Sequence, residues 1–157
     1  MMRTNKISLL AFGMLMLFGT QDLSARGILP PKAMIGHWAG EGEIAVNWTE
    51  QRRLRLDIVI SVDGKVAGKV GDAEIVDSHF GRNRPIARWF GNPPYMIRVK
   101  LNGALIEKEG IVRKGGYIVL DVKDNHLEGF FHSYGWHIGT RKTMWMAVFK
   151  MILEKVG

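Results

Sequence analysis

The feature that most constrains this chain is a period-two alternation of apolar and polar residues, which begins near Trp38 and recurs along most of the chain after it. In the segment 54–62 every second side chain is apolar, and Arg55 and Asp57 occupy positions between them. The segment 95–101 repeats the pattern. Side chains of a strand point alternately to two faces, so the alternation predicts strands with one face on a core and one in water.

Turn signals divide these segments into short pieces. Asp63-Gly64 and Asn102-Gly103 are dipeptides that favour two-residue hairpin turns, because both can adopt positive φ. After the second of them, 104–109 is predicted to pair back as a strand. Lys114-Gly115-Gly116 and Lys123-Asp124-Asn125 predict two more turns.

The last segment, 143–153, is apolar on both faces and fits a covered strand or a helix. We favour a strand, because no capping residue precedes it and a meander of strands needs a closing member. The pattern as a whole predicts an all-β domain, an up-and-down antiparallel barrel of about eight strands. A β-sandwich is the alternative. A barrel leaves no exposed strand edge, which protects the chain from aggregation.

The N-terminal segment has the layout of a secretory signal. Met1 to Lys6 is basic, Ile7 to Gly19 is apolar and uncharged, and a polar stretch ends at Ala25. The apolar run is shorter than the ~20 residues that span a bilayer comfortably. We therefore expect a signal helix over 1–25, cleaved after Ala25, and a single domain over 26–157; an uncleaved anchor and an N-terminal core helix are the alternatives.

The chain contains no cysteine. This excludes thiol catalysis, Cys-ligated zinc and a lipid-modified cysteine, and with a signal it indicates a bacterial periplasmic or secreted protein. The net charge is +7, of which the signal segment contributes Arg3, Lys6 and Asp22, so the mature domain keeps +6. A basic domain outside the cytoplasm is expected to meet anionic lipids, glycans or ligands and not nucleic acid.

The segment 81–94 breaks the alternation and mixes arginines with aromatic residues. Guanidinium groups suit phosphate or carboxylate, and exposed aromatic rings suit membrane interfaces or sugars. The alternative is a loop that covers the barrel mouth, with its rings packed inward and its arginines in water. The residues concerned are Arg82, Arg84, Arg88, Trp89 and Phe90.

Gly36-His37-Trp38 at the start of the first strand resembles the opening of the calycin barrels, the lipocalins and their relatives. In that family the tryptophan closes one end of the barrel and a late basic residue packs over it, for which Arg141 and Lys150 are the candidates here. The segments 63–73 and 127–132 are also similar to small exported β proteins of no assigned activity. The calycin resemblance implies a cavity that binds a small apolar or amphipathic molecule without chemistry.

These observations predict an exported, non-catalytic protein that holds a small lipophilic or anionic ligand in a barrel cavity, with the segment 82–90 at its mouth. The alternative is a structural or interaction protein of the bacterial envelope, whose barrel is filled by its own side chains and which binds lipid, glycan or protein through that basic, aromatic loop. A hydrolase is the third possibility. The predicted ligand-binding residues are Trp38, Arg82, Arg84, Arg88, Trp89, Phe90, Phe131 and Trp136.

Catalytic and metal-binding patterns are weak. The serines lie within or at the ends of predicted strands, without the Gly-x-Ser-x-Gly turn of many hydrolases. His126 and Glu128 share one strand face and would suit zinc only with a third ligand from elsewhere. We expect no catalytic residue, no bound metal and no cofactor.

Overall fold

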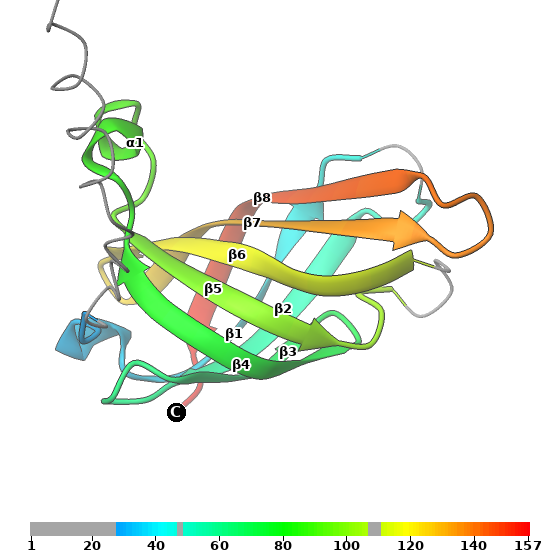
Figure 1. Cartoon of the computed structure of the whole chain (residues 1–157). Coiled ribbons are helices and arrows are strands. Elements are labelled where there is room, and N and C mark those ends of the chain that lie inside the picture. Colours follow the sequence, from blue (N-terminus) through cyan, green and yellow to red (C-terminus); the bar gives the residue numbers. More distant parts are fainter. Residues whose placement is uncertain (1–27, 47–48, 107–110) are drawn as a thin grey trace, which may run out of the picture.

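The computed structural model describes residues 28–46, 49–106 and 111–157. Eight antiparallel strands close into one barrel, so the predicted all-β barrel is confirmed and the sandwich alternative is excluded (Figure 1). The strands are β1 (Gly36–Ile44), β2 (Arg53–Ile60), β3 (Val66–Val70), β4 (Ala73–Arg82), β5 (Tyr95–Asn102), β6 (Ile111–Lys123), β7 (His126–His137) and β8 (Thr143–Lys155). No helix within the described residues has the length and hydropathy to span a membrane.

Each strand pairs with the next along the chain, and β8 returns to pair with β1. The segment 143–153 is therefore a strand, as predicted. The turn at Asp124-Asn125 is tight, with Lys123 opposite His126, and Asp124 has a φ of 48°. The Asp63-Gly64 turn is longer than the predicted two residues, because β2 ends at Ile60 and β3 begins at Val66.

Two predictions between β5 and β7 are wrong. Residues 104–106 form no strand, and the rest of the predicted strand 104–109 lies outside the described residues. Lys114-Gly115-Gly116 is no turn but lies inside β6, where the register to β7 shifts between Arg113 and Gly115. A Cβ on Gly115 would lie 2.7 Å from the Val99 carbonyl oxygen, and one on Gly116 would lie 2.6 Å from Cε2 of Phe131. These glycines permit close packing rather than reversal of the chain.

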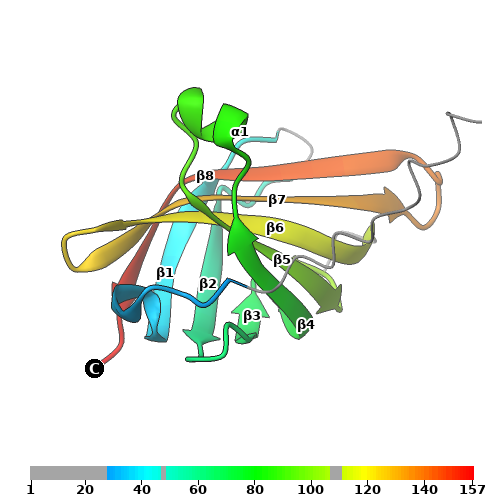
Figure 2. The same cartoon turned by 60° about the vertical axis from the view of Figure 1, so that its left-hand side comes forward.

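Two short helices flank the strands in the part of the chain that the structure describes. The 3₁₀-helix η1 (Lys32–Met34) leads into β1, and α1 (Pro85–Trp89) lies between β4 and β5. In an up-and-down barrel, β1 begins at the end where β4 finishes and β5 begins, so both helices belong to the same end. Figure 1 shows η1 and α1 at that end, and Figure 2 shows α1 standing clear of the barrel body.

The barrel interior is filled by its own side chains. Inward residues of all eight strands form one apolar cluster together with Met34. Many of them have no exposed surface at all, whereas side chains that line a cavity retain surface that water can touch. The members with 0% exposure include Met34, Leu54, Leu56, Ile58, Ile60, Ile97, Ile118, Leu120, Leu127, Phe131, Met146, Val148, Met151 and Leu153. In the described part of the chain, the barrel is a packed core.

Trp38 closes the barrel end at which η1 lies. Its side chain is 2% exposed, and its indole Nε1 donates a hydrogen bond of 2.8 Å to the carbonyl oxygen of Met34. Nζ of Lys155 lies 5.5 Å from the centre of the indole ring. The basic residue over the tryptophan is thus Lys155 and neither of the two predicted candidates, since Lys150 pairs with Glu43 at 3.0 Å and Arg141 lies in the connection after β7.

One irregularity in β8 shapes the outer surface. Toward β7, Phe149 and Lys150 together oppose the single residue Phe130, because the register shifts there. Toward β1, Lys150 and Met151 together oppose Gly42. Lys150 has a φ of 49°, and the side chains of Phe149 and Lys150 are exposed. A bulge of this kind turns two consecutive side chains to the same face and is common beside functional sites.

Candidate binding surfaces on the outer wall

The structure separates the residues that were predicted to form one ligand site. Trp38 and Phe131 are both buried in the packed core. The Phe131 ring lies against Gly116 of β6, within the barrel. Trp136 lies in β7 opposite Val112 and Thr143, and its side chain lies outside the described residues. Neither Trp38 nor Phe131 is therefore exposed to a ligand.

The five predicted residues of the 82–90 segment lie together on the protein surface. Arg82, Arg84 and Arg88 are exposed. Trp89 is 89% and Phe90 82% exposed, so the alternative in which these rings pack inward over the barrel mouth is wrong. The segment also lies at the end that Trp38 closes, not at the opposite mouth (Figure 1).

Sequence reasoning missed a continuous set of aromatic side chains across β6, β7 and β8. We call it the aromatic face. The Tyr117 and His132 rings are stacked with centres 5.0 Å apart, and Phe130 lies 6.1 Å from His132 and 6.2 Å from Phe149. Its six members are Tyr117, Phe130, His132, Tyr134, Trp145 and Phe149.

This face is partly exposed to solvent. Tyr134 is 57%, Trp145 46% and Phe149 45% exposed. Tyr134 and Trp145 are direct partners in the β7–β8 ladder. At the β5 side, the Arg98 guanidinium carbon lies 5.6 Å from the centre of the Tyr117 ring, within the range of a cation–π contact.

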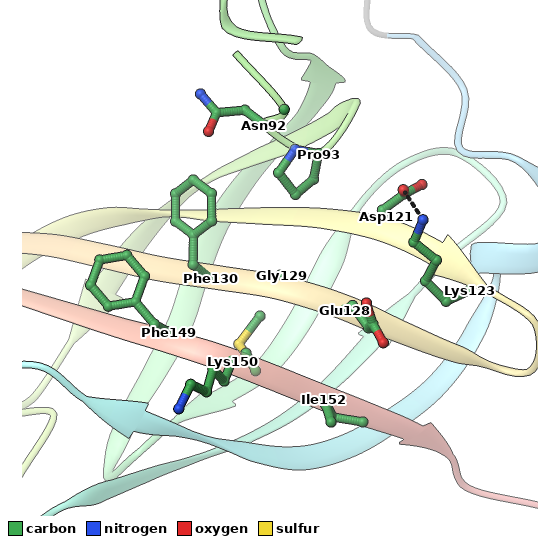
Figure 3. A pocket seen from close by; sticks show the side chains of 12 residues that line it. Asn92, Pro93, Asp121, Lys123, Glu128, Gly129, Phe130, Phe149, Lys150 and Ile152 are labelled. Atoms are coloured by element: carbon green, nitrogen blue, oxygen red, sulfur yellow. Dashed lines mark ion pairs between the residues drawn. The ribbon is translucent and has the colours of Figure 1, made fainter. Parts of the chain in front are cut away.

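A groove of about 700 Å³ adjoins the aromatic face, and we call it the wall groove. Gly91, Asn92 and Pro93, which follow α1, form one side, and β6, β7 and β8 form the other. Figure 3 shows the Phe130 and Phe149 rings side by side toward one end and the Asp121–Lys123 ion pair toward the other. The lining on the barrel side is Asp121, Lys123, Glu128, Gly129, Phe130, Phe149, Lys150, Met151 and Ile152.

A second hollow, of about 450 Å³, lies at the other side of the aromatic face, next to Tyr117 and Tyr134. Arg98, Lys100 and the glycines at 115, 116 and 135 contribute to its lining. Apolar walls with a few charged groups are typical of small-molecule sites. Both hollows are therefore on the outer wall, with the aromatic face between them.

The charges around the wall groove are paired. Lys123 lies 3.3 Å from Asp121, and Lys150 lies 3.0 Å from Glu43 of β1. His126 Nε2 donates to Glu128 Oε1 at 2.8 Å, and this hydrogen bond raises the pKa of His126 above its ordinary 6.5. Burial has the opposite effect on His132, whose pKa is lowered. The groove thus offers apolar rings and balanced charge.

The described residues hold no group of three metal-ligating side chains. His126 and Glu128, which would need a third ligand to hold zinc, form a hydrogen-bonded pair at the start of β7. The part of the aromatic face that the alternation could reveal was Phe130, His132 and Tyr134, which share one strand face. The register between β6 and β7 places Tyr117 beside His132, and the β8 bulge places Phe149 near Phe130. Neither position can be derived from the alternation within one strand.

Comparisons of the chain with protein-family models, with curated proteins and with solved structures find no match.

Proposed function

We propose that this protein is an exported, non-catalytic binding protein with a calycin-like barrel, which takes an amphipathic ligand into the wall groove and not into the barrel. The observation that carries this proposal is the contrast between a filled interior and a hollowed, aromatic outer wall. The ligand's flat apolar part would lie against Phe130, Phe149 and Pro93. Its polar part would lie among the charged groups of the lining.

The calycin likeness is supported by three features at one end of the barrel. A 3₁₀-helix precedes Gly36-x-Trp38, the indole is buried against that helix, and Lys155 lies over the ring. In the proposal, η1, Trp38 and Lys155 are structural, because their contacts close the core at this end. Binding then depends on groups that face outward.

Aromatic pairs suit a flat ligand, because ring faces and edges stack favourably at centre separations of ~4.5–7 Å. Phe130 and Phe149 are already 6.2 Å apart with their planes inclined at 45°. Such rings give contact area at low cost in side-chain entropy, since each has two rotatable bonds. The groove requires no rearrangement of the barrel to receive a ligand.

The test uses 1-anilinonaphthalene-8-sulfonate, a flat aromatic anion that fluoresces when its surroundings become apolar. We expect binding to shift the backbone amide NMR signals of 91–92, 128–130 and 149–152. Phe149→Ala should weaken binding by about tenfold, since removing a stacked ring costs up to ~1.5 kcal/mol in addition to the lost apolar contact area. Val76→Ala is the matched control, because Val76 is 59% exposed on β4, away from the groove.

Two results would refute the wall site. Shifts concentrated on inward residues such as Leu56 and Ile118 would place the probe inside the barrel, which would restore the cavity prediction. Equal weakening by Phe149→Ala and Val76→Ala would show that the probe adheres to apolar surface in general.

Export is the second part of the proposal, and it is supported by the sequence of residues 1–25, which lie outside the described residues. The protein recovered from outside the cytoplasm is expected to begin at Arg26. N-terminal sequencing or intact-mass measurement provides the test. A recovered chain that still begins at Met1 would favour the uncleaved anchor.

A further inference from the structure

We propose that the α1 protrusion, residues 82–90, docks the protein on an anionic phospholipid bilayer. This surface is separate from the lining of the wall groove, and the inference does not depend on the groove having a ligand. It rests on the exposure, the charge and the arrangement of side chains on α1.

The exposure of apolar groups on α1 is the first observation. Ile86 is 65% exposed, in addition to Trp89 at 89% and Phe90 at 82%. None of the α1 residues is buried, so the helix contributes no side chain to the barrel core. Three large apolar groups thus project into water from an element that needs none of them for packing, which is typical of an interaction surface.

The charge around α1 is the second observation. The sequence from Ser78 to Ile106 contains five basic residues, of which three lie in 82–90, and no Asp or Glu. None of the exposed arginines 82, 84 and 88 therefore has a carboxylate neighbour along this stretch of the chain. A surface of this composition is complementary to phosphate groups, and juxtamembrane arginines each strengthen attachment to an anionic bilayer about fivefold.

The arrangement of these groups is the third observation. Arg88 N donates to Arg84 O, and Phe90 N donates to Ile86 O, as in a helical turn. Residues four apart lie on the same side of a helix, so Arg84 and Arg88 share one side while Ile86 and Phe90 share another. Trp89, three positions after Ile86, extends the apolar side. One helical turn therefore presents cationic side chains beside apolar ones, as helices that lie in the membrane interface do.

A bilayer fits this surface better than a glycan does. Sugar hydroxyls are held by carboxylates and amides beside the stacking ring, and the exposed apolar Ile86 offers nothing to a hydroxyl. Tryptophan and phenylalanine favour the boundary between headgroups and acyl chains, where arginine can reach the phosphates. Because α1 stands clear of the barrel (Figure 2), it can enter that boundary while the strands stay outside the bilayer.

The test measures sedimentation of the exported protein with vesicles of phosphatidylcholine alone and of phosphatidylcholine mixed with phosphatidylglycerol. We expect binding only to the mixed vesicles, weakened when the salt concentration is raised well above about 0.1 M. The triple variant Arg82→Ala, Arg84→Ala and Arg88→Ala should lose more than about tenfold in affinity. The matched control removes the same charge elsewhere, through Arg52→Ala, Arg55→Ala and Lys69→Ala, and should lose far less.

The apolar side is tested by Trp89→Ala with Phe90→Ala, which should abolish quenching of tryptophan fluorescence by brominated phosphatidylglycerol. Trp145→Ala on the aromatic face is the control and should leave it intact. Equal losses in the two charge variants, or equal binding to both kinds of vesicle, would overturn the proposal. So would binding of heparin, a soluble polyanion, that depends on α1 while neither vesicle is bound, because it would assign α1 to a glycan. Circular dichroism spectra of the variants establish that each loss is not a loss of fold.

Discussion

Lys155, the last residue of the last strand, lies over the ring of Trp38, the third residue of the first strand. The two are direct partners in the β1–β8 ladder, and Nζ lies 5.5 Å from the indole centre. The contact therefore joins the two strands whose pairing closes the barrel. Because the same indole donates to Met34 O, one side chain ties together η1, β1 and β8.

Replacing Lys155 by Ala should lower the free energy of unfolding by about 1 kcal/mol, since a cation over an aromatic ring contributes roughly this amount. Lys150→Ala removes the same charge from the same strand, but Lys150 forms an exposed ion pair with Glu43. Such pairs contribute less than about 1 kcal/mol and often nothing measurable. Urea unfolding of both variants compares the two contributions. A larger loss of unfolding free energy in Lys150→Ala than in Lys155→Ala would contradict a stabilising contact between Lys155 and Trp38.

Gly116→Ala should destabilise the barrel by about 2 kcal/mol or more, because the added methyl would overlap a packed core. Its Cβ would lie 2.6 Å from the Phe131 ring and 2.7 Å from the His132 carbonyl oxygen. Gly81→Ala is the control, since the nearest atom to its Cβ would be 3.8 Å away. Thermal unfolding should leave Gly81→Ala near the wild type. Similar losses in both variants would mean that overlap with the Phe131 ring is not the cause of the loss at Gly116.

The alternation predicted the barrel because strand formation is a local property, written into every second side chain. The prediction failed at Lys114-Gly115-Gly116 for a non-local reason. Glycine serves both in turns and at close approaches of the backbone, and only the neighbouring Phe131 ring and the β5 backbone distinguish the two here. Likewise Lys155 was missed as the residue over Trp38, because the β1–β8 pairing joins residues far apart in sequence.

The candidate site was less predictable than the fold. The basic and aromatic composition of 82–90 was visible in the sequence, but the exposure of Trp89 and Phe90 was not, since the same residues could have packed inward. The wall groove was still harder to predict from the sequence. It requires a bulge at Phe149 and Lys150, and a bulge interrupts a ladder without leaving a distinct residue pattern.

The pKa of His126 should lie above 6.5 and should fall when Glu128 is replaced by Gln, because the Glu128 hydrogen bond is the main cause of its rise. Glu154→Gln should lower it less, since Glu154 acts only through its charge. NMR titration of the imidazole Cε1–H signal measures both. The pair stabilises the fold fully below pH 6.5, and this stabilisation is lost as the pH rises through the folded-state pKa. An unchanged titration in Glu128→Gln would contradict the assignment.

His132 should show the opposite dependence. Its pKa is lowered by burial among the rings of the aromatic face, so between its folded-state pKa and 6.5 the unfolded chain binds a proton that the folded barrel does not. Stability therefore falls as the pH drops from above 6.5 through this window. His132→Gln removes the titrating ring together with its stacking on Tyr117, so it should be less stable than the wild type near pH 8. The difference in unfolding free energy between the variant and the wild type should shrink toward pH 5. The wild type loses stability on acidification because of His132, and the variant has no such group at this position. Urea unfolding at both pH values measures the two differences, and a difference that stays constant or grows on acidification would show that His132 is not held in its neutral form by the fold.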